Sequence, residues 1–190
     1  METVLEIFRK LGAVKEGHFL LASGLHSALY FEKMKVLSHP EAASFLFSKL
    51  ADKLKSIDIE IVIGPSLGGV IIAFEVAKCL GLPCAFADRA GDKRVIRPVD
   101  VLKNGMKVAV VDDILTTGKS LRETLSALEE YAVNVVALGV LLDRSGGNVD
   151  LGIPLFSLAS LKVEAYKPED CPLCKMGIPL EVHGSATRRG

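Results

Sequence analysis

The stretch that decides the fold is Val108–Leu128, which reads VAVVDDILTTGKSLRETLSAL. It opens with four apolar residues, three of them β-branched, a pattern typical of a buried parallel strand. Two adjacent carboxylates, Asp112 and Asp113, end that run. A loop over 114–119 follows, and Ser120 is placed to cap a helix whose leucines recur at helical spacing. The stretch therefore predicts a strand, a hydroxyl- and glycine-rich turn, and the N-terminus of a helix.

This turn has the properties of a phosphate-binding loop. Free N–H groups and the helix dipole attract an anion at a helix N-terminus. Gly118 lets the backbone approach a ligand closely, while Thr116, Thr117 and Ser120 add hydroxyl donors. The spacing fits neither the Gly-x4-Gly-Lys-Ser/Thr loop nor the Gly-x-Gly-x-x-Gly dinucleotide fingerprint.

Two acids beside a phosphate site would repel the phosphate. The conflict disappears if the ligand also carries ribose hydroxyls or a divalent cation, which carboxylates bind well. A ribose 5-phosphate fits, with its phosphate in the turn and its hydroxyls on Asp112 and Asp113. The alternative is an ordinary strand-to-helix turn in which the acids are caps. Each residue alone favours that alternative, but residues 110–120 together favour the ligand.

The eleven residues VVDDILTTGKS at 110–120 resemble the motif with which type I phosphoribosyltransferases bind 5-phosphoribosyl 1-pyrophosphate (PRPP). Within that family the chain most resembles the orotate phosphoribosyltransferases. GHFLLASGLHSALYF at 17–31 and DRSGG at 143–147 carry this narrower match, which spans nearly the whole chain. The resemblance implies an α/β fold, in which helices flank a Rossmann-like, mostly parallel sheet.

Hydrophobic periodicity and turn residues predict the other elements. They are a helix over 2–11, short strands within 17–36, a helix from His39-Pro40 onward, a strand over 59–63, a helix over 70–80, and strands over 83–87, 133–142 and 154–160. The length predicts a single domain over 1–190. The resemblance divides it into a core of about residues 40–160 and a small hood built from 12–36 and 161–190.

A second glycine turn, Gly64–Gly69, lies between the strand over 59–63 and its helix. It brings further backbone donors to the same sheet edge. The resemblance makes it the loop that holds pyrophosphate, through Ser66 and Gly68. Where other orotate enzymes carry a lysine, this chain has Gly68, so the contact is expected from the backbone alone.

Residues 88–98 are cationic, contain glycine and lack periodicity. They predict a mobile loop that closes over a polyanion, with a solvated surface loop as the alternative. The resemblance favours closure and implies that the loop reaches across a dimer into the neighbouring active site. The family's usual Arg-Lys and Lys-Asp-His pattern is absent; Arg89 matches the family, whereas Lys93 and Arg94 are chosen for their charge.

The resemblance implies that the hood covers the base and that the residues after the strand over 133–142 contact it. There, Arg144 is suited to pair with the carboxylate of orotate, and the alternative is an ion pair with Asp143 or a surface role. Tyr30 and Phe31 would border the base, although Phe31 equally fits the core of the hood. Many family members carry a lysine where this chain has Ala22, and Lys33 or Lys35 are candidates to replace it.

The resemblance assigns residues to each part of the reaction. The expected catalytic residues are Asp112, Asp113, Arg89 and Lys93. The expected PRPP contacts are Asp112, Asp113, Ile114, Leu115, Thr116, Thr117, Gly118, Lys119, Ser120, Arg89, Arg94, Ser66 and Gly68. The expected orotate contacts are Thr116, Arg144, Tyr30 and Phe31. Mg²⁺ is expected on the pyrophosphate, held through PRPP and not by the protein alone.

The expected activity is transfer of the phosphoribosyl group of PRPP to orotate, giving orotidine 5′-monophosphate and pyrophosphate in pyrimidine biosynthesis. A purine phosphoribosyltransferase of the adenine or xanthine type and a non-catalytic PRPP-sensing regulator are the alternatives. The formal net charge of zero argues against a nucleic-acid or membrane partner. No apolar run or leader segment is evident, so a cytoplasmic enzyme is expected, and the resemblance implies a homodimer.

Cys171 and Cys174 form a single Cys-x-x-Cys pair. A structural zinc site needs four ligands, and this pair supplies two, with His183 or a symmetry-related copy as possible sources of the others. Without a second pair, the favoured interpretation is a reduced structural knuckle in the tail. His18, His26 and His183 have no matched partner in the sequence, and structural roles are expected for them.

Overall fold

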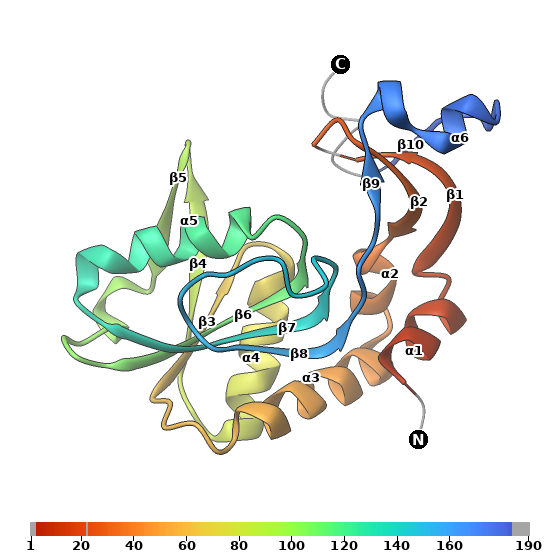
Figure 1. The fold of residues 1–190 in the computed structure, drawn as a ribbon. Helices are drawn as coiled ribbons and strands as arrows, with labels where there is room; N and C mark the ends of the chain where they lie inside the picture. Colours follow the sequence, from red (N-terminus) through yellow and green to blue (C-terminus); the bar gives the residue numbers. More distant parts are fainter. Residues whose placement is uncertain (1–2, 22, 184–190) are drawn as a thin grey trace.

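Two β-sheets of unequal size organise the chain, and the computed structural model describes residues 3–21 and 23–183 (Figure 1). The larger sheet has the strand order β5-β4-β3-β6-β7-β8, in which only β5 runs antiparallel to its neighbour. Its strands are β3 (Ile61–Pro65), β4 (Cys84–Ala90), β5 (Lys93–Arg97), β6 (Lys107–Leu115), β7 (Asn134–Asp143) and β8 (Leu155–Ser160). This is the mostly parallel α/β architecture that the sequence predicts.

Helices cover both faces of the larger sheet, as Figure 1 shows. On one face, α3 (Pro40–Leu54) and α4 (Gly68–Leu80) pack through a cluster that includes Leu46, Leu50 and Ile72. On the other face, α5 (Lys119–Leu128) packs through Leu121 and Leu128. Both faces of the central strands are therefore buried, which explains their continuous apolar runs. None of the described helices is both long and apolar enough to cross a membrane.

The smaller sheet joins the two ends of the chain in the order β10-β1-β2-β9. Its strands are β1 (Val14–Leu20), β2 (His26–Phe31), β9 (Ala165–Tyr166) and β10 (Glu181–Val182). The flanking helices are α1 (Val4–Lys10), α2 (Lys33–Leu37) and α6 (Pro172–Lys175), and short 3-10 turns occur at Val99–Val101, Glu129–Tyr131 and Pro168–Asp170. We call β1, β2, β9, β10 and α6 the hood. It stands beside the larger sheet in Figure 1.

The element boundaries differ from the predicted ones at the two turns. Strand β6 continues through both acids to Leu115, because β7 pairs with it as far as Asp143. Helix α4 begins at Gly68, two residues earlier than predicted. The predicted cap at Ser120 is wrong: the N-cap of α5 is Gly118, and no side chain caps this helix. The loops at the sheet edge are thus shorter than the sequence pattern suggests.

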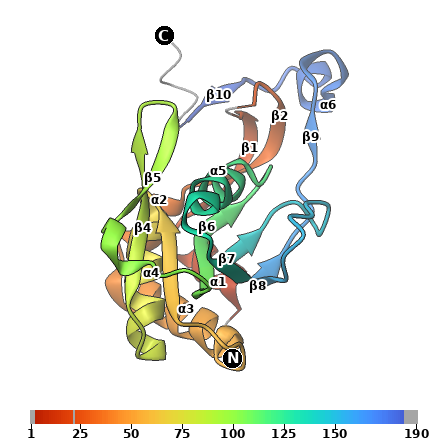
Figure 2. The same cartoon turned by 90° about the vertical axis from the view of Figure 1, so that its left-hand side faces the viewer.

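The prediction of an aperiodic loop over 88–98 is also wrong. Its two halves belong to β4 and β5, which form an antiparallel hairpin with Arg89 opposite Arg94 and a turn at Gly91. The hairpin projects from the edge of the sheet (Figure 2). The sequence shows no alternation of apolar and polar residues here, because charged residues occupy both exposed and buried positions of β5. Arg94 is buried on the same face of the strand as the apolar Ile96.

Candidate active site

The carboxyl ends of β3 and β6 bring both predicted loops together. The two strands pair in parallel, with Ile63 opposite Val110, so the turns that follow them lie at the same sheet edge. The turn after β3 consists only of Ser66 and Leu67, which are joined by a cis peptide bond, before α4 begins.

Glycine is required in the turn after β3 because the backbone packs against its surroundings. A Cβ atom on Gly68 would lie 2.1 Å from Oδ2 of Asp113, and one on Gly64 would lie 1.9 Å from the carbonyl oxygen of Gly69. A lysine at position 68 is therefore incompatible with this placement of Asp113. The close approach also shows that the two loops form a single site.

The acid pair lies on the two faces of β6, since neighbouring residues in a strand point to opposite sides. Asp113 faces Gly68 on the α4 side, whereas Asp112 is hydrogen bonded by Ser120 on the α5 side. The two residues are only 7% and 3% exposed, for Asp112 and Asp113 respectively. Lys33, at the start of α2, places its Nζ 2.8 Å from Oδ2 of Asp113.

Burial and neighbouring charges shift the pKa values of Asp112 and Lys33. Burial, followed by the neighbouring charge of Asp113, raises the pKa of Asp112 to about 7. Burial alone would lower the pKa of Lys33, but the charge and hydrogen bond of Asp113 outweigh it and raise that pKa. Among the described residues Lys33 is paired with Asp113, and Asp112 is only partly ionised near neutral pH.

The turn after β6 presents unsatisfied donors at the start of α5. Thr116 and Thr117 are exposed, and Gly118 adopts φ +77°, a conformation that favours glycine. The N–H of Lys119 donates to Oγ1 of Thr117 at 3.4 Å. Among the described residues no N-cap side chain serves the N–H groups that follow it. Ser120, displaced from the capping position, instead accepts a hydrogen bond from Nη2 of Arg94 at 3.2 Å. These features match a site for a phosphate group.

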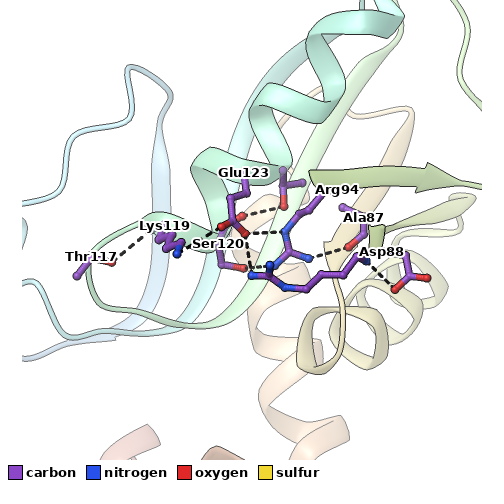
Figure 3. A network of polar contacts seen from close by, with 9 residues as sticks. Ala87, Asp88, Arg94, Thr117, Lys119, Ser120 and Glu123 are labelled. Atoms are coloured by element: carbon purple, nitrogen blue, oxygen red, sulfur yellow. Dashed lines mark hydrogen bonds and ion pairs between the residues drawn. The ribbon is translucent and has the colours of Figure 1, made fainter. Parts of the chain in front are cut away.

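Glu123 of α5 gathers three cations near this turn (Figure 3). Its Oε2 lies 3.1 Å from Nη2 of Arg89 and 3.3 Å from Nε of Arg94, and its Oε1 lies 3.8 Å from Nζ of Lys119. Arg94 is buried and also donates to the carbonyl oxygen of Ala87 at 2.9 Å. Arg94 therefore joins the hairpin to α5, while Lys93 is exposed beside the hairpin turn.

Arg144 follows β7 and lies between the hood and the larger sheet. Its guanidinium stacks 4.7 Å above the ring of Phe31, and its buried Nε has no hydrogen-bond partner among the described residues. Burial lowers the pKa of Arg144, against a smaller raising effect of Tyr30. Such a desolvated cation is suited to bind an anion.

The aromatic residues of β2 have different surroundings. Phe31 is buried and packs edge-on against Phe8, with ring centroids 6.5 Å apart, so it belongs to the core as well as supporting Arg144. Tyr30 is half-buried beside the ring of Phe19. Burial, and then the charge of Glu32, raises the pKa of its phenol. Ala22, the other residue considered near the base, lies outside the described residues.

Sequence reasoning missed Glu123, although its position four residues after Lys119 was a usable signal for an ion pair. The sequence suggested Lys33 only as one of two candidates to replace the lysine that many family members carry at position 22. Lys33 on α2 and Asp113 on β6 are 80 residues apart in the sequence. Their contact depends on how α2 packs against the larger sheet, which the sequence does not show.

Comparison with known proteins agrees with this geometry. Residues 35–165 match the family "Phosphoribosyl transferase domain". The orotate phosphoribosyltransferase of Thermotoga maritima is 46% identical over 96% of this chain and 97% of its own length. That of Caldanaerobacter subterraneus is 41% identical over 97% of both. The crystal structure of orotate phosphoribosyltransferase from Aeropyrum pernix superposes with a TM-score of 0.72 at 28% identity, covering 92% of this chain and 98% of that one.

Replacing Asp112 with Asn should stabilise the protein most at high pH. Aspartate in an unfolded chain ionises near pH ~3.9, but in the folded chain Asp112 ionises near 7. Between these values the folded state binds more protons, so wild-type stability falls as pH rises through this window. From about pH 4.5 to about pH 8, Asp112→Asn should gain roughly 1–3 kcal/mol in unfolding free energy relative to wild type, measured by urea denaturation.

The control is Asp100→Asn, whose carboxylate is exposed and which should show no such gain. Identical pH profiles for Asp112→Asn and wild type would contradict the raised pKa.

Proposed function

The chain belongs to the phosphoribosyltransferase family, among its orotate phosphoribosyltransferases, and we propose that its reaction takes place at the carboxyl edge of β3, β6 and β7. The reaction joins orotate to PRPP and releases orotidine 5′-monophosphate and pyrophosphate. The observation that supports this location best is the buried acid pair between the uncapped start of α5 and the tight glycine turn. A sugar that carries phosphate at one end and pyrophosphate at the other has the matching chemistry.

The turn Thr116–Ser120 would hold the 5-phosphate of PRPP. The free N–H groups of α5 and the threonine hydroxyls would donate to its oxygens, with Ile114 and Leu115 placing the backbone that precedes them. Asp112 and Asp113 would accept hydrogen bonds from the ribose hydroxyls. The phosphate contact lies away from the bond that breaks, and together with the hydroxyl contacts it would orient the reacting carbon.

Pyrophosphate would lie against the turn after β3. Ser66 offers its hydroxyl, and Gly68 places the uncapped start of α4 beside Asp113. Lys33 contributes the cation that a side chain at position 68 cannot provide here, since its Nζ reaches the same carboxylate. This arrangement would balance negative charge around the leaving group.

Mg²⁺ fits this site as a partner of PRPP. The donor set is two carboxylates, of which one is paired with Lys33 and the other has a pKa of about 7, so the protein alone does not offer a cage of free anionic oxygens. Asp112 and Asp113 are the residues that would hold the ion together with PRPP. When bound, Mg²⁺ neutralises charge on the leaving pyrophosphate.

The reaction needs charge control more than proton transfer. As the bond to pyrophosphate lengthens, positive charge develops on the sugar, and the acids of β6 would stabilise it. Arg89 and Lys93 on the hairpin would approach the departing pyrophosphate. Arg89 is exposed and is held by Glu123 through one ion pair, which a phosphate group can replace. Closure of the hairpin would exclude the water that hydrolyses PRPP.

Orotate would bind between β7 and the hood. The buried Nε of Arg144 has no hydrogen-bond partner in the described part of the chain and would pair with the carboxylate of the base. Phe31 holds the guanidinium from behind, whereas Tyr30 and Thr116 would border the ring.

The active protein is a homodimer in this proposal. Leu67, Ile71 and Phe74 are 69%, 41% and 56% exposed and recur at helical spacing along the start of α4. An exposed apolar stripe of this kind suits a subunit interface. It directly follows Ser66, so a partner would lie near the active site and could receive the hairpin. We place the enzyme in the cytoplasm, which four unpaired cysteines support.

The direct test is an absorbance assay of the full chain with PRPP, Mg²⁺ and one base at a time. Orotate should be consumed, whereas adenine, xanthine and uracil should not. Asp113→Asn should reduce turnover about 100-fold without unfolding the protein, because the charge that stabilises the sugar cation is lost. Asp58→Asn, which breaks a surface pair with Lys107 remote from the site, is the matched control and should keep full activity.

Use of a purine in place of orotate would overturn the assigned substrate. Full turnover by Asp113→Asn would contradict the proposed role of the acid pair.

Replacing Arg144 with Ala should weaken the binding of orotate much more than the binding of PRPP. Loss of a charged, desolvated hydrogen-bonding partner costs about 1.5–3 kcal/mol, or roughly a 10- to 100-fold rise in KM for orotate. Arg144→Lys keeps the charge but loses the planar pair of donors, so it should stay impaired. Steady-state kinetics with each substrate varied in turn would measure both effects, and Arg9→Ala on the exposed face of α1 is the control. Equal losses for both substrates would indicate a structural role.

If the hairpin acts across the dimer, two inactive variants should restore one another. An Arg89→Ala, Lys93→Ala chain keeps its acid pair, and an Asp113→Asn chain keeps its hairpin. In an equal mixture about half of the dimers are mixed and each has one complete site, so roughly a quarter of wild-type activity should return. Mixed dimers that are verified by mass spectrometry and stay inactive would place the hairpin in its own subunit's site.

A further inference from the structure

Four potential metal ligands converge in the hood, and none of them is among the residues assigned to the reaction. His18 lies on β1, His26 begins β2, Cys171 precedes α6 and Cys174 lies within it. Their ligand atoms all lie within 4.8 Å of one another, and this is a cluster of two imidazoles and two thiols. In the sequence, the cysteine pair is separated from the histidines by more than 140 residues, which is why the set was not recognised there.

The spacing of the four atoms matches a tetrahedral zinc site. Nε2 of His18 lies 2.9 Å from Nδ1 of His26, 3.5 Å from Sγ of Cys171 and 3.7 Å from Sγ of Cys174. Sγ of Cys174 lies 3.3 Å from Nδ1 of His26. With Zn–N bonds of about 2.0–2.1 Å and Zn–S bonds of about 2.3 Å, a tetrahedron separates its ligands by about 3.3–3.8 Å. Of these four distances, only that between the two nitrogens is shorter, and the remaining two pairs lie within 4.8 Å. A bound cation would separate the nitrogens slightly.

The tautomer of His18 is fixed in the form that a metal requires. Its Nδ1 lies 2.7 Å from the carbonyl oxygen of Ile178, and a carbonyl can only accept, so Nδ1 carries the proton and donates. Nε2 of the neutral ring therefore offers its lone pair toward the cluster. Metal-binding histidines commonly make this type of hydrogen bond with the second ring nitrogen.

Hydrogen bonding without a metal satisfies this cluster poorly. The single lone pair on Nε2 of His18 faces three neighbours, His26 and the two thiols, and it can accept well from only one of them. The two imidazoles meet at an interplanar angle of 64°, so they converge edge-on and are not stacked. One cation at the centre would satisfy all four ligands together.

His183, which the sequence suggested as a third ligand, is not part of the cluster. Its Nε2 lies 2.8 Å from Oε2 of Glu181, and its ring packs on Tyr30 with centroids 5.2 Å apart. No second copy of the chain is needed, because His18 and His26 complete the set within one chain.

We propose that His18, His26, Cys171 and Cys174 bind one structural Zn²⁺ ion in the hood. Four protein ligands leave no open position for substrate or water, which is typical of a structural site and not of a catalytic one. His18, His26 and Cys171 are buried, whereas Cys174 is exposed and gives the ion a route of entry.

The ion would join the two ends of the chain. The hairpin of β1 and β2 comes from the N-terminal part, and the cysteines come from the C-terminal part, so the site closes a loop of more than 150 residues. The hood depends on this closure, since β9 and β10 have only two residues each and contribute few backbone hydrogen bonds. Through β2, the ion would also stabilise the segment that carries Tyr30 and leads to Lys33.

Metal content tests this proposal without reference to activity. The full chain, prepared without an affinity tag or chelator, should contain about one zinc per chain by mass spectrometry of the metals. Cys174→Ser should lose most of it, and because Cys174 is exposed this change leaves the packing of the hood intact. Cys79→Ser, at an exposed cysteine outside the cluster, is the matched control and should keep the metal.

A second measurement uses the protein after removal of metal. Titration with Co²⁺ should give the visible spectrum of a tetrahedral thiolate site in wild type and Cys79→Ser but not in Cys174→Ser. Adding Zn²⁺ should raise the melting temperature of wild type by about 5–10 °C and leave that of Cys174→Ser nearly unchanged. Equal metal content, Co²⁺ spectra and melting shifts in wild type and Cys174→Ser would overturn the proposal, even if the protein is fully active as a transferase.

Discussion

The proposed active site depends on keeping two like charges buried at the end of one strand. Asp112 and Asp113 are consecutive in β6 and almost fully buried, and among the described residues Lys33 is the cation that lies beside both of them. The larger sheet makes this possible, because β3 and β7 hold β6 from both sides and fix its backbone. The cost appears in the pKa of Asp112, which rises to about 7. A ligand that donates hydroxyl groups to these acids would favour their charged forms, so part of its binding energy would offset the cost of burying them.

The same constraint determines the turn beside the acids. Asp113 can occupy its position only because Gly68 has no side chain, and the start of α4 then comes close to the carboxylate. The cation that position 68 cannot supply comes from Lys33 on α2. Charge balance in the site thus depends on how α2 and the hood are held against the larger sheet. Arg144 makes a second contact of this kind through its stacking on Phe31.

The sequence predicts local features better than contacts between distant segments. The strand, turn and helix at Val108–Leu128 were predictable because β-branched runs and helical spacing report burial directly. The extension of β6 through the acids was not, because it depends on pairing with β7. The hairpin of β4 and β5 was missed since Arg94, a charged residue, occupies a buried position that Glu123 and Ser120 make tolerable. Strands are recognised in a sequence by apolar residues at every second position, and a buried, paired arginine interrupts that pattern.

The four ligands of the hood explain why a small sheet can support an active site. Strands of two residues cannot hold the C-terminal segment by hydrogen bonds alone, because each contributes few of them. A metal ion bound by four side chains can supply the stabilisation that longer paired strands would give. It requires the correct placement of those four ligands and no long strand. His18 and His26 lie on the neighbouring strands β1 and β2. Cys171 and Cys174 lie one turn apart at the start of α6. The order of the hood, and with it the position of Lys33 at the acid pair, then depends on a site that takes no part in the chemistry.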